Sequence, residues 1–206
     1  MRTPLIVACG ALASELRAVL QTAGLANAVD VRYLPANLHN RPDQIVPALR
    51  DVLANCDALT PDPARPVLIG YSDCGTGGHL DALLAEYPHL QRLPGAHCYE
   101  MFAGAATFAA LHDAAPGTFY LTDFLAKHFD ALVWQGLGLD RHPQLRDTYF
   151  GNYTRLVLLS QTSDAAVLAA AEDAAARLGL AFQHVPTGCD GLAHAVTVTI
   201  STGKAA

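Results

Sequence analysis

Short apolar runs alternate along the chain with longer segments in which apolar residues recur every three or four positions. The runs are typical of buried strands, and the longer segments are typical of helices with one buried face. The predicted strands are residues 4–8, 29–34, 66–69, 156–159, 181–185 and 195–200, with 118–125 as a further strand or an extended start to a helix. The predicted helices are residues 11–23, 42–53, 79–86, 98–111, 127–134 and 164–178.

This alternation predicts how the elements assemble. Strands separated by helices of this length form βαβ units, in which a helix connects two parallel strands. The predicted fold class is therefore α/β, with a mainly parallel sheet and helices on both faces in a Rossmann-like, three-layer arrangement. The 206 residues and the hydrophobic content of 51% suffice for one substantial core. We expect a single α/β domain over residues 1–206, or two small lobes with a boundary near residues 110–120.

The charge balance narrows the classes of partner. The formal net charge is −6, and only 13 residues are Lys or Arg, with no run that forms a basic stripe. Nucleic acid is therefore not expected as a partner, because neutralising its phosphates needs clustered Lys and Arg. The composition favours a protein that handles a small-molecule substrate or another protein.

We expect neither membrane insertion nor export. No apolar stretch approaches the ~20 residues that cross a bilayer, and the first residues do not have the pattern of a signal peptide. The prediction is a cytoplasmic location. In that reducing compartment the five cysteines are core, metal-binding or reactive thiols rather than disulfides, and their odd number agrees.

The segment Gly70–Gly78 carries the most informative chemistry, because a thiol and a glycine-rich turn follow directly after a buried run. Cys74 lies in this turn, and Cys9 ends another predicted strand, again before a glycine and a helix. Ligands of open α/β sheets bind at the carboxyl ends of the strands. His39 follows the second predicted strand, and Cys98 comes after the loop that follows the helix over 79–86. We expect these four side chains to reach one edge of the sheet.

Thiolates and imidazoles that converge from separate loops are typical of a zinc site. The candidate ligands are Cys74, Cys98 and His39. Cys9 is either a fourth ligand or a thiol beside the site. An iron–sulfur cluster held by Cys9, Cys74 and Cys98 is the rival for the same residues. Each cysteine taken singly also fits core packing, which is the interpretation for Cys56.

Glu100 and Tyr71 are the candidate catalytic residues. Glu100 follows Cys98 by two positions and could act as a general acid or base, or orient a ligand histidine. The alternative is an acidic charge that stabilises a helix N-terminus. A nucleophilic Cys–His pair also stays open, because such partners meet in space rather than in sequence. The pairs considered join Cys74 or Cys98 with His39 or His97.

Gly75 and Gly77 are candidates for holding a small anion through backbone N–H groups. The stretch matches neither the nucleotide-binding Gly-x-Gly-x-x-Gly pattern nor the P-loop with its Lys-Ser/Thr end. An ATPase is therefore disfavoured. A non-catalytic protein that binds a small anion or a partner domain is the alternative to a metal-binding enzyme or enzyme accessory.

Six short motifs complete the picture. They are Ala8–Leu12, Leu38–Pro42, Asp73–Gly75, His97–Glu100, Tyr120–Leu125 and Gly136–Asp140. With these motifs the chain resembles the DUF1638 family, a group of bacterial and archaeal proteins of about this length whose activity is not established. Members are sometimes encoded near corrinoid-dependent methyltransferase systems. This context suits a thiolate–metal site, whose zinc would serve methyl transfer to a thiol or hydrolytic chemistry. The more specific hypothesis is a metal-dependent methyltransferase with a corrinoid protein as its partner.

Overall fold

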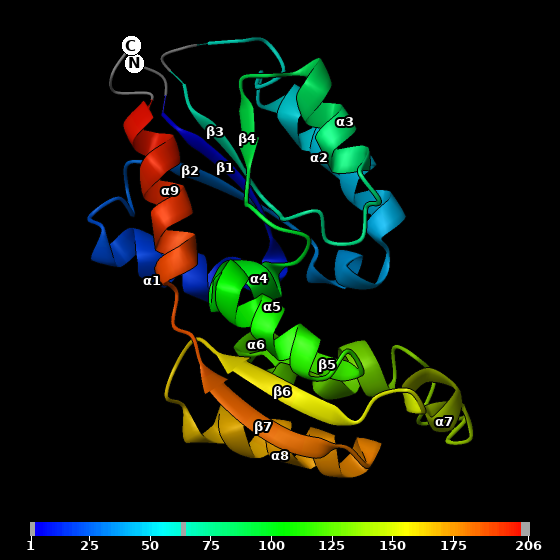
Figure 1. Ribbon diagram of the computed structural model, residues 1–206. Coiled ribbons are helices and arrows are strands. Elements are labelled where there is room, and N and C mark those ends of the chain that lie inside the picture. Colours follow the sequence, from blue (N-terminus) through cyan, green and yellow to red (C-terminus); the bar gives the residue numbers. More distant parts are fainter. Residues whose placement is uncertain (1–2, 63–64, 203–206) are drawn as a thin grey trace. The chain divides into compact units, whose positions relative to one another are not determined.

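The computed structural model describes residues 3–62 and 65–202, which form two compact units (Figure 1). Unit 1 combines the chain up to Met101 with the segment that begins at Cys189, and unit 2 is Phe102–Gly188. Each unit is built on its own parallel sheet. The C-terminal helix therefore belongs to the same unit as the first strands.

Unit 1 has a four-stranded parallel sheet in the order β2-β1-β3-β4. Its strands are β1 (Leu5–Cys9), β2 (Asp30–Leu34), β3 (Val67–Gly70) and β4 (Leu90–Arg92). Its helices are α1 (Ala13–Thr22), α2 (Ile45–Asn55), α3 (His79–Glu86), α4 (Cys98–Ala103, which runs on into unit 2) and α9 (Asp190–Thr202). Short 3-10 turns are η1 (Gly10–Leu12), η2 (Ala36–Asn40) and η3 (Pro42–Gln44).

Helices cover both faces of this sheet, which gives the predicted three layers (Figure 1). On one face Val7 and Ile69 pack in one buried cluster with Leu49 of α2 and Leu80 of α3. On the other face α1 and α9 lie beside each other, and Val196 of α9 is fully buried. Strands buried on both faces need apolar side chains at every position, which explains the continuous runs of β1 and β3.

Unit 2 has a three-stranded parallel sheet in the order β5-β6-β7. Its strands are β5 (Thr118–Thr122), β6 (Arg155–Ser160) and β7 (Ala181–Pro186). Its helices are α5 (Ala105–Ala114), α6 (Asp123–Lys127), the π-helical turn η4 (Asp130–Trp134), α7 (Leu145–Phe150) and α8 (Ala165–Leu178). The buried carboxylate of Asp123 accepts the N–H groups of Gln161 and Thr162, so it ties the end of β5 to the end of β6.

The predicted α/β class is confirmed, but the strands form two separate parallel sheets rather than one. The predicted helix over 98–111 is interrupted at Gly104, whose φ of +77° ends α4 and precedes α5. The division into one domain or two lobes stays a prediction. None of the helices in the described part of the chain is long and apolar enough to span a membrane.

The predicted strand over residues 195–200 is wrong, because these residues lie in α9. Their alternating β-branched residues resemble a strand pattern. Leu192, Val196 and Ile200 are spaced four apart and all buried, whereas Val198 is 45% exposed. This spacing places the three buried residues on one helical stripe, which packs toward β3 and α1.

Gly70 is expected to be required for the close packing of β3 on β1. A Cβ at this position would lie 2.6 Å from the Cβ of Ala8 and 2.8 Å from its Cα. Gly70→Ala should therefore lower the free energy of unfolding by about 1–3 kcal/mol, measured by urea denaturation. Adding Ala8→Gly should recover part of the loss, because it removes one of the two contacts. A Gly70→Ala protein as stable as the wild type would contradict this explanation.

Candidate metal centre

The four strands of unit 1 run parallel, so the segments that follow them meet at one edge of the sheet. Cys9 is the last residue of β1, and His39 lies in η2 after β2. Cys74 lies in the turn after β3, and Cys98 begins α4 after β4. The structure thus places the four candidate ligands at the carboxyl edge of a single sheet.

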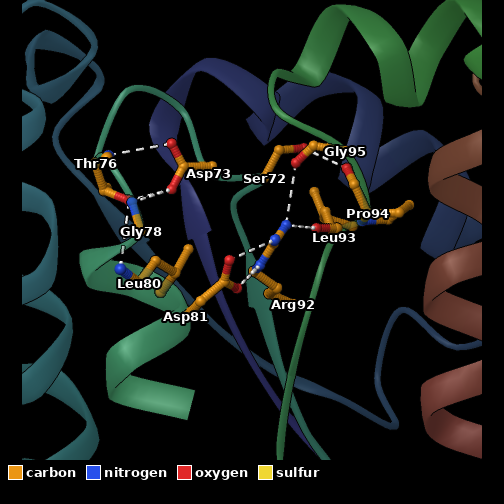
Figure 2. Close-up of polar contacts among 11 residues, drawn as sticks. Ser72, Asp73, Thr76, Gly78, Leu80, Asp81, Arg92, Leu93, Pro94 and Gly95 are labelled. Carbon is orange, nitrogen blue, oxygen red and sulfur yellow. Dashed lines mark hydrogen bonds and ion pairs between the residues drawn. The ribbon is translucent and has the colours of Figure 1, made fainter. Parts of the chain in front are cut away.

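Three hydrogen bonds join the loop after β3 to the loop after β4, and Figure 2 shows part of this region. They run from the Ser72 hydroxyl to the Pro94 carbonyl (2.7 Å), from the Asp73 N–H to the Gly95 carbonyl (3.2 Å), and from the Cys74 N–H to the Ala96 carbonyl (2.9 Å). Because Cys98 follows two residues after the last of these carbonyls, the bonds fix its backbone beside that of Cys74.

Arg92 supports the second of these loops (Figure 2). Its guanidinium donates to both carboxylate oxygens of Asp81 in α3, at 2.6 and 3.1 Å. The remaining Nη1 donates to the carbonyls of Leu93 and Gly95, at 2.8 and 3.1 Å. A bidentate pair of this kind fixes the orientation of the guanidinium, so Arg92 links α3 to the loop that carries the second thiol.

Asp73 organises the glycine-rich turn from within (Figure 2). Its carboxylate accepts the Thr76 hydroxyl at 2.6 Å and the N–H groups of Gly77 and Gly78 at 3.2 and 3.0 Å. The Thr76 hydroxyl is the main reason that the pKa of Asp73 lies below its ordinary value. The N–H of Gly77 is therefore already bonded to an internal anion, whereas Gly75 lines the neighbouring pocket.

Cys74 has a positive φ of 52°, which non-glycine residues seldom adopt. Backbone strain of this kind persists only where neighbouring contacts enforce it, and it gathers at functional sites. Here the bond from its N–H to Ala96 holds the residue in place. The strained geometry marks the turn as a candidate site independently of the thiol.

A pocket of about 260 Å³ opens at this edge of the sheet. Its lining consists of His39, Pro42, Cys74, Gly75, His97, Cys98 and Tyr99. Two thiols and two imidazoles therefore face one small space, and no carboxylate, lysine or arginine is among these lining residues. From the sequence, His97 is expected only as the partner of a nucleophile, and Pro42 and Tyr99 are not among the expected site residues.

The three thiols lie close enough to affect one another electrostatically. Burial, with a smaller contribution from the Cys9 thiol, raises the pKa of Cys74 to about 11. Burial also raises the pKa of Cys98 well above its usual value, with contributions from Cys74 and Cys9. The N–H groups of Cys98 and Tyr99 point toward the Cys98 sulfur and offset only part of this effect. In the absence of a cation these thiols are protonated near neutral pH.

Cys9 faces Tyr71 rather than the pocket. Burial raises the pKa of the Cys9 thiol, while the Ala11 N–H and the Tyr71 hydroxyl, both directed at its sulfur, lower it. The Tyr71 side chain is only 2% exposed, and its hydroxyl has no hydrogen bond of standard geometry among the described residues. Burial also raises the pKa of Tyr71, so its hydroxyl stays a proton donor.

His39 and His97 lie near each other on the pocket wall. Desolvation lowers the pKa of His39, and the neighbouring His97 lowers it further. A neutral imidazole is the form of histidine that binds metals. The His97 ring also lies beside Tyr99, with the ring centroids 6.1 Å apart.

Glu100 supports the second loop instead of facing the pocket. One carboxylate oxygen accepts the Ala96 N–H at 3.0 Å. The same carboxylate occupies the space in which a Cβ on Gly95 would stand. Glu100 and the Cys74 N–H therefore hold opposite sides of Ala96, and a catalytic role for Glu100 stays a prediction.

The remaining cysteines lie elsewhere. Cys56 packs against the buried cluster beneath α2, which agrees with a core role. Cys189 lines a different pocket, of about 290 Å³, together with residues of α1 and α9. Within the described ranges, no three His, Cys, Asp or Glu side chains already enclose a metal position. The pocket groups would have to rotate toward a common ion in order to bind it.

The fold and the pocket define an α/β protein with thiols and imidazoles at the carboxyl edge of one sheet. The family described as "Protein of unknown function (DUF1638)" matches residues 33–196, so the chain belongs to the DUF1638 family. The matched range includes all four pocket thiols and imidazoles, and it begins after Cys9. No curated protein matches the chain, and no solved structure matches it either.

Asp73→Asn should destabilise the protein by about 1 kcal/mol at neutral pH, because it removes a charged acceptor from the glycine-rich turn. The native pKa lies below the ordinary 3.8, so this stabilisation is complete above pH 3.8 and is lost as the pH falls through the native pKa. Urea denaturation at several pH values should show the gap between wild type and variant closing in acid. Asp51→Asn, on the exposed side of α2, is the matched control. A difference in the free energy of unfolding that does not change with pH would contradict a stabilising role for the Asp73 carboxylate.

Cys74 in the metal-free, reduced protein should react slowly with iodoacetamide. Its pKa of about 11, against an ordinary 9.0, lowers the thiolate fraction at pH 8 by about 100-fold. Peptide mapping by mass spectrometry should show that alkylation of Cys74 is much slower in the folded protein than in the urea-unfolded protein. Equal rates in the two states would show that folding does not raise the pKa of this thiol.

Proposed function

We propose that this protein binds a metal ion in the pocket at the carboxyl edge of unit 1, with zinc as the metal. Cys74, Cys98 and His39 are the proposed ligands. One observation carries the proposal: the three side chains come from three separate loops and line the same pocket of about 260 Å³. Thiolate and imidazole are donors that zinc prefers in proteins.

The protonation states support a metal site better than a metal-free nucleophile. Burial keeps the thiols of Cys74 and Cys98 protonated, and a protonated thiol is a poor nucleophile. A bound divalent ion displaces thiol protons, and the neutral imidazole of His39 has none to lose before binding. The Cys–His nucleophilic pair is therefore the weaker interpretation of the same residues.

Three protein ligands leave one position for a substrate, as in catalytic zinc sites. We propose a metal-dependent transferase that acts on a small molecule, since the pocket is smaller than the roughly 300–1,000 Å³ of sites for drug-sized ligands. The reducing cytoplasm would keep its thiols available.

Methyl transfer is the specific form of this proposal, and it rests on the corrinoid association of the family. Zinc held by Cys74, Cys98 and His39 would supply a Lewis acid that favours the thiolate form of a substrate thiol. The methyl donor would be the methyl-cobalt(III) of a corrinoid protein, which would become cobalt(I) when the thiolate takes the methyl group. Tyr71, whose buried hydroxyl faces Cys9, would serve as a hydrogen-bond donor to the thiol cluster.

Two other functions remain as alternatives. An iron–sulfur cluster held by Cys9, Cys74 and Cys98 is supported by the electrostatic coupling of the three thiols. Anion binding at the glycine-rich turn is less well supported. The carboxylate of Asp73 already occupies the N–H groups of Gly77 and Gly78, and its charge repels a second anion.

Cys74→Ser should remove most of the metal. We expect wild-type protein, purified without chelators and supplied with zinc, to hold about one zinc ion per chain by elemental analysis. The Cys74→Ser protein should hold almost none, because one thiolate ligand is lost. Cys56→Ser is the matched control, since Cys56 packs against the core, and it should keep the wild-type content. Unchanged zinc in Cys74→Ser would reject this site.

The absorbance spectrum of protein purified without oxygen separates zinc from a cluster. Zinc is a d¹⁰ ion and gives a colourless protein, whereas an iron–sulfur cluster gives a brown one with visible absorbance. A brown protein whose colour is lost in Cys9→Ser would favour the cluster. A protein that takes up neither metal, with thiols that stay unreactive, would reject both.

A further inference from the structure

The pocket wall offers four donors, and one of them, His97, is not among the metal ligands expected from the sequence. Cys74 and Cys98 supply thiols, and His39 and His97 supply imidazoles. Cys9, by contrast, is not among the described residues that line the pocket. Four donors from three loops match the number that tetrahedral zinc takes in closed sites.

The backbone of His97 is fixed on both sides. Its carbonyl accepts the N–H of Glu100 at 3.1 Å in the first turn of α4. The preceding residue, Ala96, is bonded to the N–H of Cys74 through its carbonyl and to the Glu100 carboxylate through its N–H. The backbone of His97 therefore keeps a set position relative to Cys74, and its exposed side chain lines the pocket.

The two histidines approach the pocket from different loops. His39 comes from η2 after β2, and His97 from the loop after β4. They are close enough for the charge of one to affect the other. Two imidazoles that face one space beside two thiols are the donor set of a Cys₂His₂ site.

Cys9 already has other partners. The Ala11 N–H and the buried Tyr71 hydroxyl are both directed at its sulfur. Turning this thiol into the pocket would break both interactions. The buried Tyr71 hydroxyl would then lose the sulfur at which it is directed. Cys9 is therefore better suited to packing beside the metal site, in contact with Tyr71, than to binding the metal.

We infer that His97 is the fourth donor of the metal site, together with Cys74, Cys98 and His39, and that Cys9 does not bind the metal. This inference rests on the proposed metal site. With four protein donors the resting site is closed, and a substrate position opens only when one of the two exposed imidazoles, His39 or His97, leaves.

Cobalt(II) is the probe, because it substitutes for zinc and its absorbance reports both thiolate number and geometry. The samples are the wild type, Cys9→Ser, His97→Ala and, as a matched histidine control outside the pocket, His112→Ala. Circular dichroism checks that each variant is folded. Cys9→Ser should keep the full thiolate-to-cobalt charge-transfer intensity of the wild type. His97→Ala should shift the visible ligand-field bands, and added imidazole should restore them, whereas His112→Ala should match the wild type.

The outcomes separate this inference from the proposed function. A wild type that shows no cobalt–thiolate absorbance rejects the proposed metal site itself. Cobalt binding with about one third of the charge-transfer intensity lost in Cys9→Ser assigns Cys9 as a ligand and overturns the inference. Ligand-field bands that His97→Ala leaves unchanged also overturn it. If Cys9→Ser does not fold, Cys9→Ala provides the same comparison.

Discussion

Two backbone hydrogen bonds hold the candidate site together. They run from the N–H groups of Asp73 and Cys74 to the carbonyls of Gly95 and Ala96. The parallel sheet brings the loops to one edge, but loops at one edge can still diverge. These two bonds join them, and Arg92 and Glu100 hold the second loop from either side. The positions of both pocket thiols depend on this junction.

Much of the fold could be predicted because strands buried on both faces leave continuous apolar runs. The runs of β1, β3 and β6 are of this kind, and all three are strands. The strand β4 has only three residues, one of them exposed, so it leaves no comparable run. The alternating β-branched residues of α9 resemble a strand pattern over residues 195–200. The four-residue spacing of a helix is recognisable only when Leu192 is considered together with Val196 and Ile200. Pairing is not encoded locally, which is why two sheets could not be distinguished from one.

The site was predictable to the level of the sheet edge and no further. Topology alone places the end of each parallel strand and the turn after it at the carboxyl edge of the sheet, which covers Cys9 and Cys74. The direction of each side chain depends on tertiary neighbours. The fully buried Tyr71 draws Cys9 away from the pocket, and the Asp73 carboxylate fills the glycine turn. Neither contact can be predicted from the spacing of residues along the sequence.

The return of α9 to unit 1 determines the order in which the protein can be completed. The apolar stripe of α9 covers a face of the first sheet, yet its residues are made only after the whole of unit 2. At typical rates of synthesis this delay is on the order of ten seconds. Until α9 is made, the face of the first sheet that α1 and α9 share is only partly covered, whereas Phe102–Gly188 has all its strands as soon as β7 is complete. The unit that emerges second is therefore the one able to mature first, and the pocket-bearing unit is finished last.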